Sequence, residues 1–296
     1  MPDYPFMQVD AFTDQPLSGN PCAVLFDTEN LNEGVMQAIA REMNLSETAF
    51  IRQSEVADFG VRFFTPAEEI PLAGHPTIAT IQALIDSARL MLSSETTMIS
   101  LELKEGPITV EIHANDGTPP LIVMAQRRPQ FLATYDPSEI LPVFGLTQKD
   151  LLPGATIQTI STGTPQLMVP LSSLASLRHT TLDSAAYEKL RLRADFFSPH
   201  LFCLCGITPD GDTYAQHFGT PPDLMEDPFT GSATGGMAAY LWHYGLIHKQ
   251  IFIAEQGHWL NRPGQARVEV VGSPNNIQTV KVGGSAVTVL RGNLVI

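Results

Sequence analysis

Residues 69–77 (EIPLAGHPT) are matched by residues 226–234 (EDPFTGSAT), and this repeat decides the fold that the sequence predicts. Glu, Pro, Gly and Thr recur at a constant offset of 157 residues (226 − 69), and an apolar, helix-like stretch follows each copy. A weaker pair, GNP at 19–21 and GTP at 163–165, points the same way. Chance matching of common Gly and Pro residues is the alternative. The paired helices favour a true repeat, which indicates two related lobes.

Helical periodicity is confined to four main segments between many short, β-type apolar runs. The segments are 33–43, 76–91, 184–191 and 233–244. Because strands outnumber helices and do not alternate with them, we expect an α+β fold and not a doubly wound parallel sheet. The breaker cluster at 115–120 (NDGTPP) is the predicted junction. It divides the chain into an N-terminal lobe, 1–117, and a C-terminal lobe, 118–283. The last segment, 284–296, is a candidate strand to complete the first lobe.

The composition describes a globular, acidic protein. Among 296 residues, 17 Lys and Arg oppose 31 Asp and Glu, which gives a net charge of −14, and 44% of the residues are hydrophobic. The acidic balance argues against nucleic acid or an anionic membrane as partner. No apolar run is long enough to span a bilayer, and no basic segment resembling a signal peptide opens the sequence. With only three cysteines, which form no disulfide framework, we expect a cytoplasmic protein.

Each repeated loop leads into a helix that begins near a glycine. His75 with Pro76, and Ser232 in the second copy, are the predicted first-turn and capping residues. Helix N-termini carry unpaired N–H groups and a positive partial charge, and Gly74 and Gly231 would let a ligand approach the backbone. Two such ends facing one cleft would bind a carboxylate without Lys or Arg. The alternative is ordinary capping of two core helices. The expected partner is therefore a small anionic metabolite.

Three side chains are candidates for acid–base chemistry. Glu47 stands among apolar neighbours, where burial would raise its pKa and let it shuttle a proton near neutral pH. A solvated glutamate or a backbone cap is the alternative. Asp227 opens the second glycine loop, although an Asp-Pro turn would explain it equally. His75 is a proton donor or a hydrogen-bonding cap.

Other chemistries find no support in the sequence. It contains no HExxH zinc motif, no GxSxG nucleophile elbow, no Walker A loop and no GxGxxG loop. We therefore expect neither a metal nor a cofactor.

Short motifs occur in a fixed order along nearly the whole chain: VDAF at 9–12, GNP at 19–21, LSETAF at 45–50, FTP at 64–66, AGHPT at 73–77, STGTP at 161–165, EDPFTGSA at 226–233, EQG at 255–257 and RP at 262–263. On these motifs the chain resembles the phenazine-biosynthesis PhzF-like isomerase family, within the diaminopimelate epimerase-like fold. Each motif is short, and together they are specific.

The resemblance implies two similar lobes, each a β-barrel-like sheet around a central helix, with the active site between them. It implies that Glu47 moves the proton and that Asp227 and His75 assist. The residues it assigns to substrate binding are Ser46, Gly74, Gly231 and Ser232. Related epimerases use two opposed cysteines, one before each glycine motif. Here those positions hold Ala73 and Thr230, and the cysteines lie elsewhere.

These observations predict a cofactor-independent isomerase that shifts a proton within a small carboxylate-bearing metabolite. An epimerase or racemase of a small acid is one alternative. It would need a second base, such as Asp227, opposite Glu47. A non-catalytic binding protein on the same fold is another. A homodimer is compatible with the family, and no residue specifies it.

Overall fold

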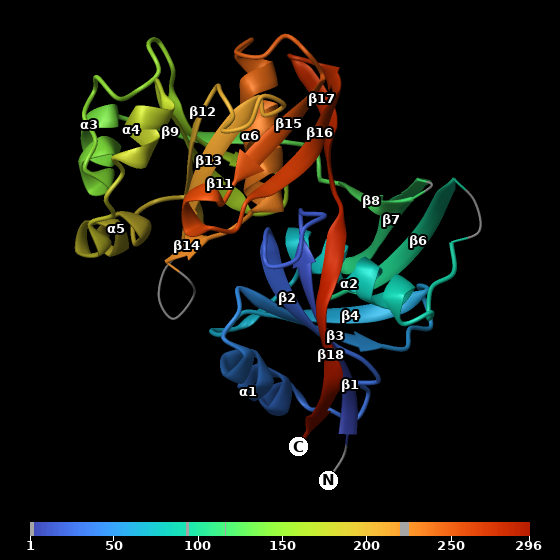
Figure 1. Ribbon diagram of the computed structural model, residues 1–296. Coiled ribbons are helices and arrows are strands. Elements are labelled where there is room, and N and C mark those ends of the chain that lie inside the picture. The colour runs from blue at the N-terminus through green and yellow to red at the C-terminus, as the bar shows by residue number, and fades with distance from the viewer. Residues whose placement is uncertain (1–2, 93–94, 116, 220–224) are drawn as a thin grey trace.

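The computed structural model describes residues 3–92, 95–115, 117–219 and 225–296, and it confirms a mixed α+β fold with one large sheet and few helices (Figure 1). The helices in these ranges are α1 (Glu33–Met43), α2 (Gly74–Asp86), α3 (Pro137–Ile140), α4 (Leu174–Arg178), α5 (Ser184–Arg191), α6 (Gly231–His243) and the 3-10 helices η1 (Leu141–Phe144) and η2 (His258–Leu260). None of these described helices has the length and apolar character needed to cross a membrane.

The strands run through the whole described chain. In the first part of the chain, residues 3–135, the strands are β1 (Asp3–Ala11), β2 (Asn20–Leu25), β3 (Glu47–Arg52), β4 (Phe59–Phe64), β5 (Glu69–Ile70), β6 (Thr96–Leu103), β7 (Gly106–Asn115), β8 (Thr118–Ala125) and β9 (Gln130–Tyr135). In the second part, from residue 136 onward, the strands are β10 (Ile157–Ser161), β11 (Pro165–Pro170), β12 (Ser198–Cys203), β13 (Thr213–Phe218), β14 (Glu226–Asp227), β15 (Ile251–Gln256), β16 (Gly264–Ser273), β17 (Asn276–Gly284) and β18 (Ala286–Val295).

The two copies of the sequence repeat adopt the same local structure. Each begins with a two-residue strand, β5 or β14, that pairs with the end of the preceding long strand, β4 or β13. Each then enters a helix of 13 residues, α2 or α6, at the repeated glycine. The repeated threonines act alike as well, because Thr77 Oγ1 donates to Ala73 O at 2.8 Å and Thr234 Oγ1 donates to Thr230 O at 2.9 Å.

Strand register extends this correspondence beyond the loops. The parallel pair β2–β3 places Cys22 opposite Glu47. The parallel pair β11–β12 places Gln166 opposite Ser198. Cys22 follows the GNP motif as Gln166 follows the matching GTP motif. By register, therefore, Ser198 occupies in the second part of the chain the position that Glu47 occupies in the first.

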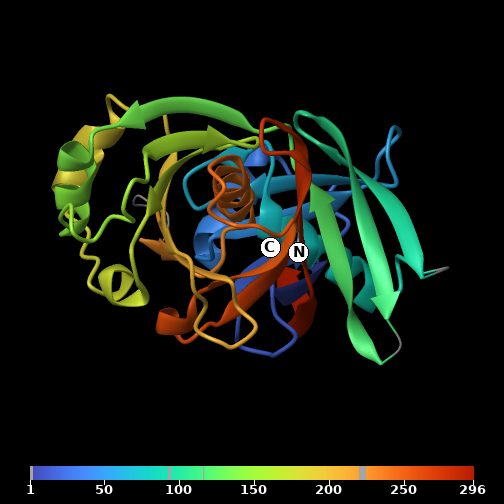
Figure 2. The same cartoon turned by 90° about the horizontal axis from the view of Figure 1, so that it is seen from above.

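Both repeat helices are buried, and one hydrophobic cluster contains side chains from each. Ile78 and Ile81 of α2 and Met237 and Leu241 of α6 belong to it. Figure 2 looks along α6, with strands of the second part of the chain around it. A helix that is apolar on all sides needs such a position, which explains why neither helix shows a strong polar face.

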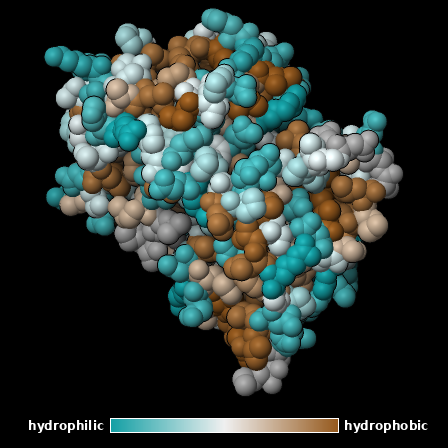
Figure 3. Space-filling model, viewed as in Figure 1, coloured by the Kyte–Doolittle hydropathy of each residue, from teal (hydrophilic) through white to brown (hydrophobic). Residues whose placement is uncertain are grey.

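The two ends of the chain lie together. β18 pairs antiparallel with β1 from Asp3 opposite Val295 to Ala11 opposite Ala286, and the two strands run side by side in Figure 1. In the space-filling view of the same face, hydrophobic residues gather at that lower end (Figure 3), and Val295 and Leu290 are exposed. The predicted junction lies at the hairpin between β7 and β8, with residue 116 outside the described ranges. The division into lobes at that point stays a prediction.

The ends of two predicted helices were wrong. The segment predicted as 76–91 is helical from Gly74 to Asp86, and Ala88 then takes a positive φ of 58°. The segment predicted as 233–244 is helical from Gly231 to His243. Both helices begin earlier because the glycine itself, and not the residue after it, forms the first helical turn.

Candidate active site

The seven residues predicted for the site line one cavity of about 520 Å³. They are Ser46, Glu47, Gly74, His75, Asp227, Gly231 and Ser232. They come from the start of β3, the start of α2, β14 and the start of α6. The structure thus brings together residues that are far apart in the chain. Their individual roles remain predictions.

The starts of α2 and α6 meet at the wall of this cavity. A Cβ built on Gly74 would lie 3.3 Å from the backbone N of Ser232 and 3.4 Å from Cα of Gly231. The predicted capping by His75 and Ser232 was wrong, because the N-cap residues are Ala73 and Thr230 and neither makes a side-chain cap hydrogen bond. Two helix N-termini without side-chain caps therefore meet in one place, and their N–H groups and dipoles favour an anion there.

Glu47 and His75 are in contact beside these helix ends. His75 Nε2 lies 3.2 Å from Glu47 Oε2, and the side chains are 4% and 19% exposed, respectively. Burial lowers the pKa of His75 from 6.5 to about 3. The imidazole is therefore neutral at physiological pH, where it carries a proton on one nitrogen only.

Asn20 decides which nitrogen of His75 carries that proton. Its amide Nδ2, which can only donate, lies 3.1 Å from His75 Nδ1 and also donates to Asp227 Oδ1 at 2.8 Å. The same group donates to Phe229 O at 2.8 Å. The two hydrogens of Nδ2 serve the two shorter contacts, and Nδ2 cannot accept, so a proton on His75 Nδ1 would face another donor. This favours the tautomer with the proton on Nε2, the nitrogen beside Glu47. Asn20 is fully buried, so this orientation is fixed by its surroundings.

Asp227 lies in the same network as Glu47. Its carboxylate accepts hydrogen bonds from Ser46 Oγ at 2.8 Å, from Asn20 and from Thr230 Oγ1. Burial raises the pKa of Asp227 above its ordinary value of 3.8, and these hydrogen bonds oppose the rise. Gln256 Nε2 donates to the Asp227 carbonyl at 2.6 Å, which fixes the backbone of the second loop.

A buried ion pair and an aromatic stack hold the loop before Asn20 against the second part of the chain. Arg262 donates to Asp10 Oδ1 at 2.7 Å and to the carbonyl of Gly19 at 2.8 Å. The rings of Phe12 and Phe229 stack with centroids 4.2 Å apart. Both contacts join residues near the N-terminus to residues beyond 228. The site therefore depends on packing between distant parts of the chain.

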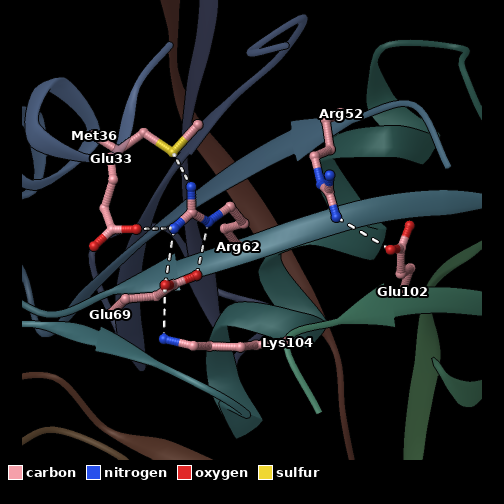
Figure 4. A network of polar contacts seen from close by, with 7 residues as sticks. All are labelled: Glu33, Met36, Arg52, Arg62, Glu69, Glu102 and Lys104. Carbon is pink, nitrogen blue, oxygen red and sulfur yellow. Dashed lines mark hydrogen bonds and ion pairs between the residues drawn. The ribbon is translucent and has the colours of Figure 1, made fainter. Parts of the chain in front are cut away.

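Glu69, at the start of the first repeat, is held in an ion-pair network (Figure 4). Arg62 donates to both of its carboxylate oxygens, at 2.7 and 2.9 Å, and Lys104 Nζ donates to Oε2 at 2.9 Å. The hydrogen bonds from Arg62 hold the pKa of Glu69 below its ordinary value. Glu226, its counterpart in the second repeat, has a pKa raised by burial. Glu69 lines the cavity, but its ion pairs make it a poorer candidate for the proton acceptor than Glu47.

Metal ligands do not converge anywhere in the described ranges, where no group of three His, Cys, Asp or Glu side chains could hold an ion. Cys22 is buried on β2 opposite Glu47, and Cys203 and Cys205 lie at the end of β12 and just beyond it. The residues that precede the two repeated glycines are Ala73 and Thr230, so neither position holds a thiol.

Asn20 was missed by the sequence reasoning, although it links His75 to Asp227. A signal was present, because Asn20 lies in the GNP motif that forms the weaker half of the repeat. Its role could not be assigned, since a single asparagine in a turn before a strand is usually explained by the turn.

A buried neutral histidine beside a carboxylate, next to two helix N-termini, is an arrangement suited to acid–base chemistry. The chain belongs to the phenazine biosynthesis-like protein family, whose model matches residues 9–292. The predicted family is thereby confirmed.

Relatives and a solved structure agree with the family. The chain is 35% identical over 283 residues to the "Uncharacterized isomerase YfhB" of Bacillus subtilis, covering 95% of each chain. It is 33% identical over 298 residues to the trans-2,3-dihydro-3-hydroxyanthranilate isomerase of Pseudomonas chlororaphis, covering 98% of this chain and 99% of that one. The crystal structure of a Bacillus anthracis phenazine biosynthesis protein of the PhzF family matches with a TM-score of 0.89 at 30% identity, covering 100% of both chains. The prediction of an isomerase is confirmed.

Proposed function

We propose that this isomerase shifts a proton between two carbons of a small carboxylate-bearing metabolite, without a cofactor. One observation carries the proposal. The two helix N-termini that meet at Gly74 and Gly231 lie in the same cavity as the Glu47–His75 contact. An anion held at the helix ends would place the neighbouring carbons of the substrate within reach of a carboxylate base.

In the proposed reaction Glu47 is the base. It takes a proton from an activated carbon, so the C–H electron pair enters the conjugated system of the substrate. Glu47 then returns that proton to another carbon. His75 Nε2, which lies 3.2 Å from Glu47 Oε2, would help to hold the carboxylate in position while it is ionised. Asn20 fixes the His75 tautomer, and the N–H groups of the helix starts bind the substrate carboxylate.

A single base is favoured over the opposed pair that an epimerase needs. Ser46, the neighbour of Glu47, donates to Asp227, so these two carboxylates lie in one network. The register-related partner of Glu47 is Ser198, which is no base at neutral pH. The residues before the two glycines are Ala73 and Thr230. These positions support a proton shift on one face of the substrate.

We further propose the finer architecture that the family resemblance implies. Each of two lobes would form a barrel-like sheet around α2 or α6, with the cavity between them. The matched loops and strand registers of the two repeats support this proposal. A homodimer and a cytoplasmic location remain predictions from the sequence.

The test is a screen of small carboxylate metabolites by NMR in deuterated buffer. The wild type should incorporate deuterium at carbon into at least one compound and isomerise it. Glu47→Gln should lower both rates by at least 1,000-fold, about 4 kcal/mol of transition-state stabilisation, while its unfolding midpoint stays near that of the wild type. Glu68→Gln, an exposed neighbour on the same cavity wall, is the matched control. A Glu47→Gln enzyme with wild-type turnover would refute the role of Glu47. Tight binding without exchange would favour a binding protein.

A further inference from the structure

The wall of the cavity formed by β11, β12 and β13 carries buried polar side chains that the proposed proton transfer does not use. Gln166, Ser198 and His217 all line the cavity. They are 2%, 2% and 5% exposed, respectively. Polar side chains buried to this extent are normally fully hydrogen-bonded, because an unsatisfied donor or acceptor is costly. A donor on this wall that has no partner within the protein therefore indicates what a bound ligand must offer.

The repeat shows that these polar residues are specific to the second part of the chain. His217 pairs with His200 between β13 and β12, where the first part pairs Phe63 with Ala49 between β4 and β3. His217 also stands opposite Asp227 on β14, as Phe63 stands opposite Ile70 on β5. The first part thus builds this position from apolar side chains. The fold alone does not require the two histidines.

Gln166 presents a hydrogen-bond donor that the protein leaves unused. Ser198 Oγ donates to Gln166 Oε1 at 2.6 Å, which fixes the orientation of the amide. Over the described ranges, the Nε2 group of Gln166 has no hydrogen-bond partner. Gln166 lines the cavity, so Nε2 is available to an acceptor there.

His217 presents a second donor. Its Nδ1 lies 3.3 Å from Nδ1 of His200, so one of the two rings must carry its proton there. Nε2 of His200 is buried and has no partner among the described residues. A buried N–H without an acceptor is rarer than a buried acceptor without a donor. His200 therefore carries its proton on Nδ1 and donates to His217, which leaves the proton of His217 on Nε2. Since His217 lines the cavity, this N–H is the donor that it can offer there.

We propose that Gln166 and His217 form a second substrate subsite, which binds an oxygen acceptor that the substrate carries in addition to its carboxylate. The inference rests on the proposed function in one respect, namely that the substrate occupies this cavity. The guanidinium of Arg191 lies 5.2 Å from the ring centroid of Phe197, and both residues line the same cavity. Two donors that the protein leaves unused favour carboxylates with an additional hydroxyl or carbonyl oxygen over plain carboxylates.

Binding of unreactive probes tests this subsite without turnover. Benzoate and its 2-, 3- and 4-hydroxy derivatives share one carboxylate and differ in a single oxygen. The full-length wild type should bind at least one hydroxybenzoate about fivefold or more tightly than benzoate, as one or two added hydrogen bonds imply. Gln166→Met, and the double variant His200→Ala/His217→Phe, should reduce that preference to less than twofold while benzoate affinity changes by less than twofold. The double variant copies the Ala49–Phe63 pair, which the fold already accommodates.

Gln216→Met is the matched control. Gln216 is the neighbour of His217 on β13 and is also buried, but it donates to Glu226 and does not line the cavity. It should keep the full hydroxyl preference. The subsite is refuted if no hydroxybenzoate binds more tightly than benzoate, or if Gln166→Met keeps the preference. Because no step of this test needs Glu47, failure of the proposed proton transfer would appear only in deuterium exchange.

Discussion

His75 Nε2 lies 3.2 Å from Glu47 Oε2, and this contact joins the first turn of α2 to the first residue of β3. Because His75 Nδ1 faces the amide donor of Asn20, the neutral ring is expected to carry its proton on Nε2, the nitrogen beside Glu47. The neutral imidazole thus lies next to the proposed base with only 4% of its side chain exposed. The network is polar yet contains neither Lys nor Arg, which agrees with anion binding by helix ends.

The buried histidines should make stability depend on pH in a defined window. The pKa of His75 is about 3 in the folded protein and 6.5 when it is unperturbed. Between these values the unfolded chain binds a proton that the folded chain does not. The contribution of His75 to stability is therefore fully present above pH 6.5 and is lost as the pH falls toward 3. The expected slope is about 1.4 kcal/mol per pH unit.

Urea unfolding of the wild type and of His75→Gln at pH 4.5, 5.5 and 7.5 measures that slope. In the variant, the number of protons taken up on unfolding between pH 4.5 and 5.5 should be lower by about one than in the wild type. His217→Phe should lose a similar amount, since burial also lowers the pKa of His217 to about 3. Equal slopes in all three proteins would contradict the assignment of neutral buried histidines.

Asn20→Leu should destabilise the protein by about 1–3 kcal/mol, because it removes a buried donor from Asp227 and His75. Asn293→Leu is the control. Asn293 also donates to an aspartate, Asp3 at 3.1 Å, but at the surface, so its replacement should change stability by less than about 0.5 kcal/mol. Chemical denaturation measures both changes. Similar losses in the two variants would show that the Asn20 network is not special.

Alanine at either repeated glycine should disturb the meeting of the two helices. A Cβ on Gly231 would lie 2.8 Å from Cζ of Phe12, so Gly231→Ala should cost about 1–3 kcal/mol through overpacking. Gly74→Ala meets the backbone N of Ser232 at 3.3 Å and should weaken benzoate binding at least tenfold, measured by titration. Gly292→Ala, with no heavy atom within 4 Å of the added Cβ, is the control. Unchanged benzoate affinity in Gly74→Ala would argue against anion binding at the helix ends.

Breaking the Asp10–Arg262 pair should be costly. Burial raises the pKa of Asp10 even though Arg262 opposes the rise, and the Asp10 side chain is 1% exposed. Arg262→Met would leave that carboxyl group buried without its partner, at a cost of about 3–5 kcal/mol. Arg267→Met, which breaks a half-exposed pair with Glu269, should cost less than about 1 kcal/mol. Thermal and urea unfolding compare the two, and comparable costs would contradict this reading.

Local signals in the sequence predicted some elements fully and others in part. Helix α1 was predicted with its observed bounds, because its apolar residues repeat at helical spacing. The structure adds Asn32 as its N-cap. The end of α2 was missed because Leu90 continues the apolar pattern beyond Asp86. It packs against the core from outside the helix. Periodicity records which residues are buried and does not record how the backbone buries them.

The candidate site divides in the same way. Glu47, His75 and Asp227 belong to recognisable motifs, so sequence reasoning could find them. Gln166 and His217 are uncharged residues within strands, where local sequence gives no sign that they differ from other half-polar strand positions. Only the pairing of β11 with β12 and of β12 with β13 brings them to the cavity.

The sequence by itself determined the repeat, the glycine at each helix start and the family to which the chain belongs. These features are local, because a loop and the helix after it are encoded by neighbouring residues. Tertiary structure alone decided that Gly74 meets Gly231, that Asn20 joins His75 to Asp227, and which donors remain free in the cavity. Those contacts link residues far apart in the chain. They exist only after long-range strand pairing and the burial of α2 and α6 in one core have fixed the two repeats against each other.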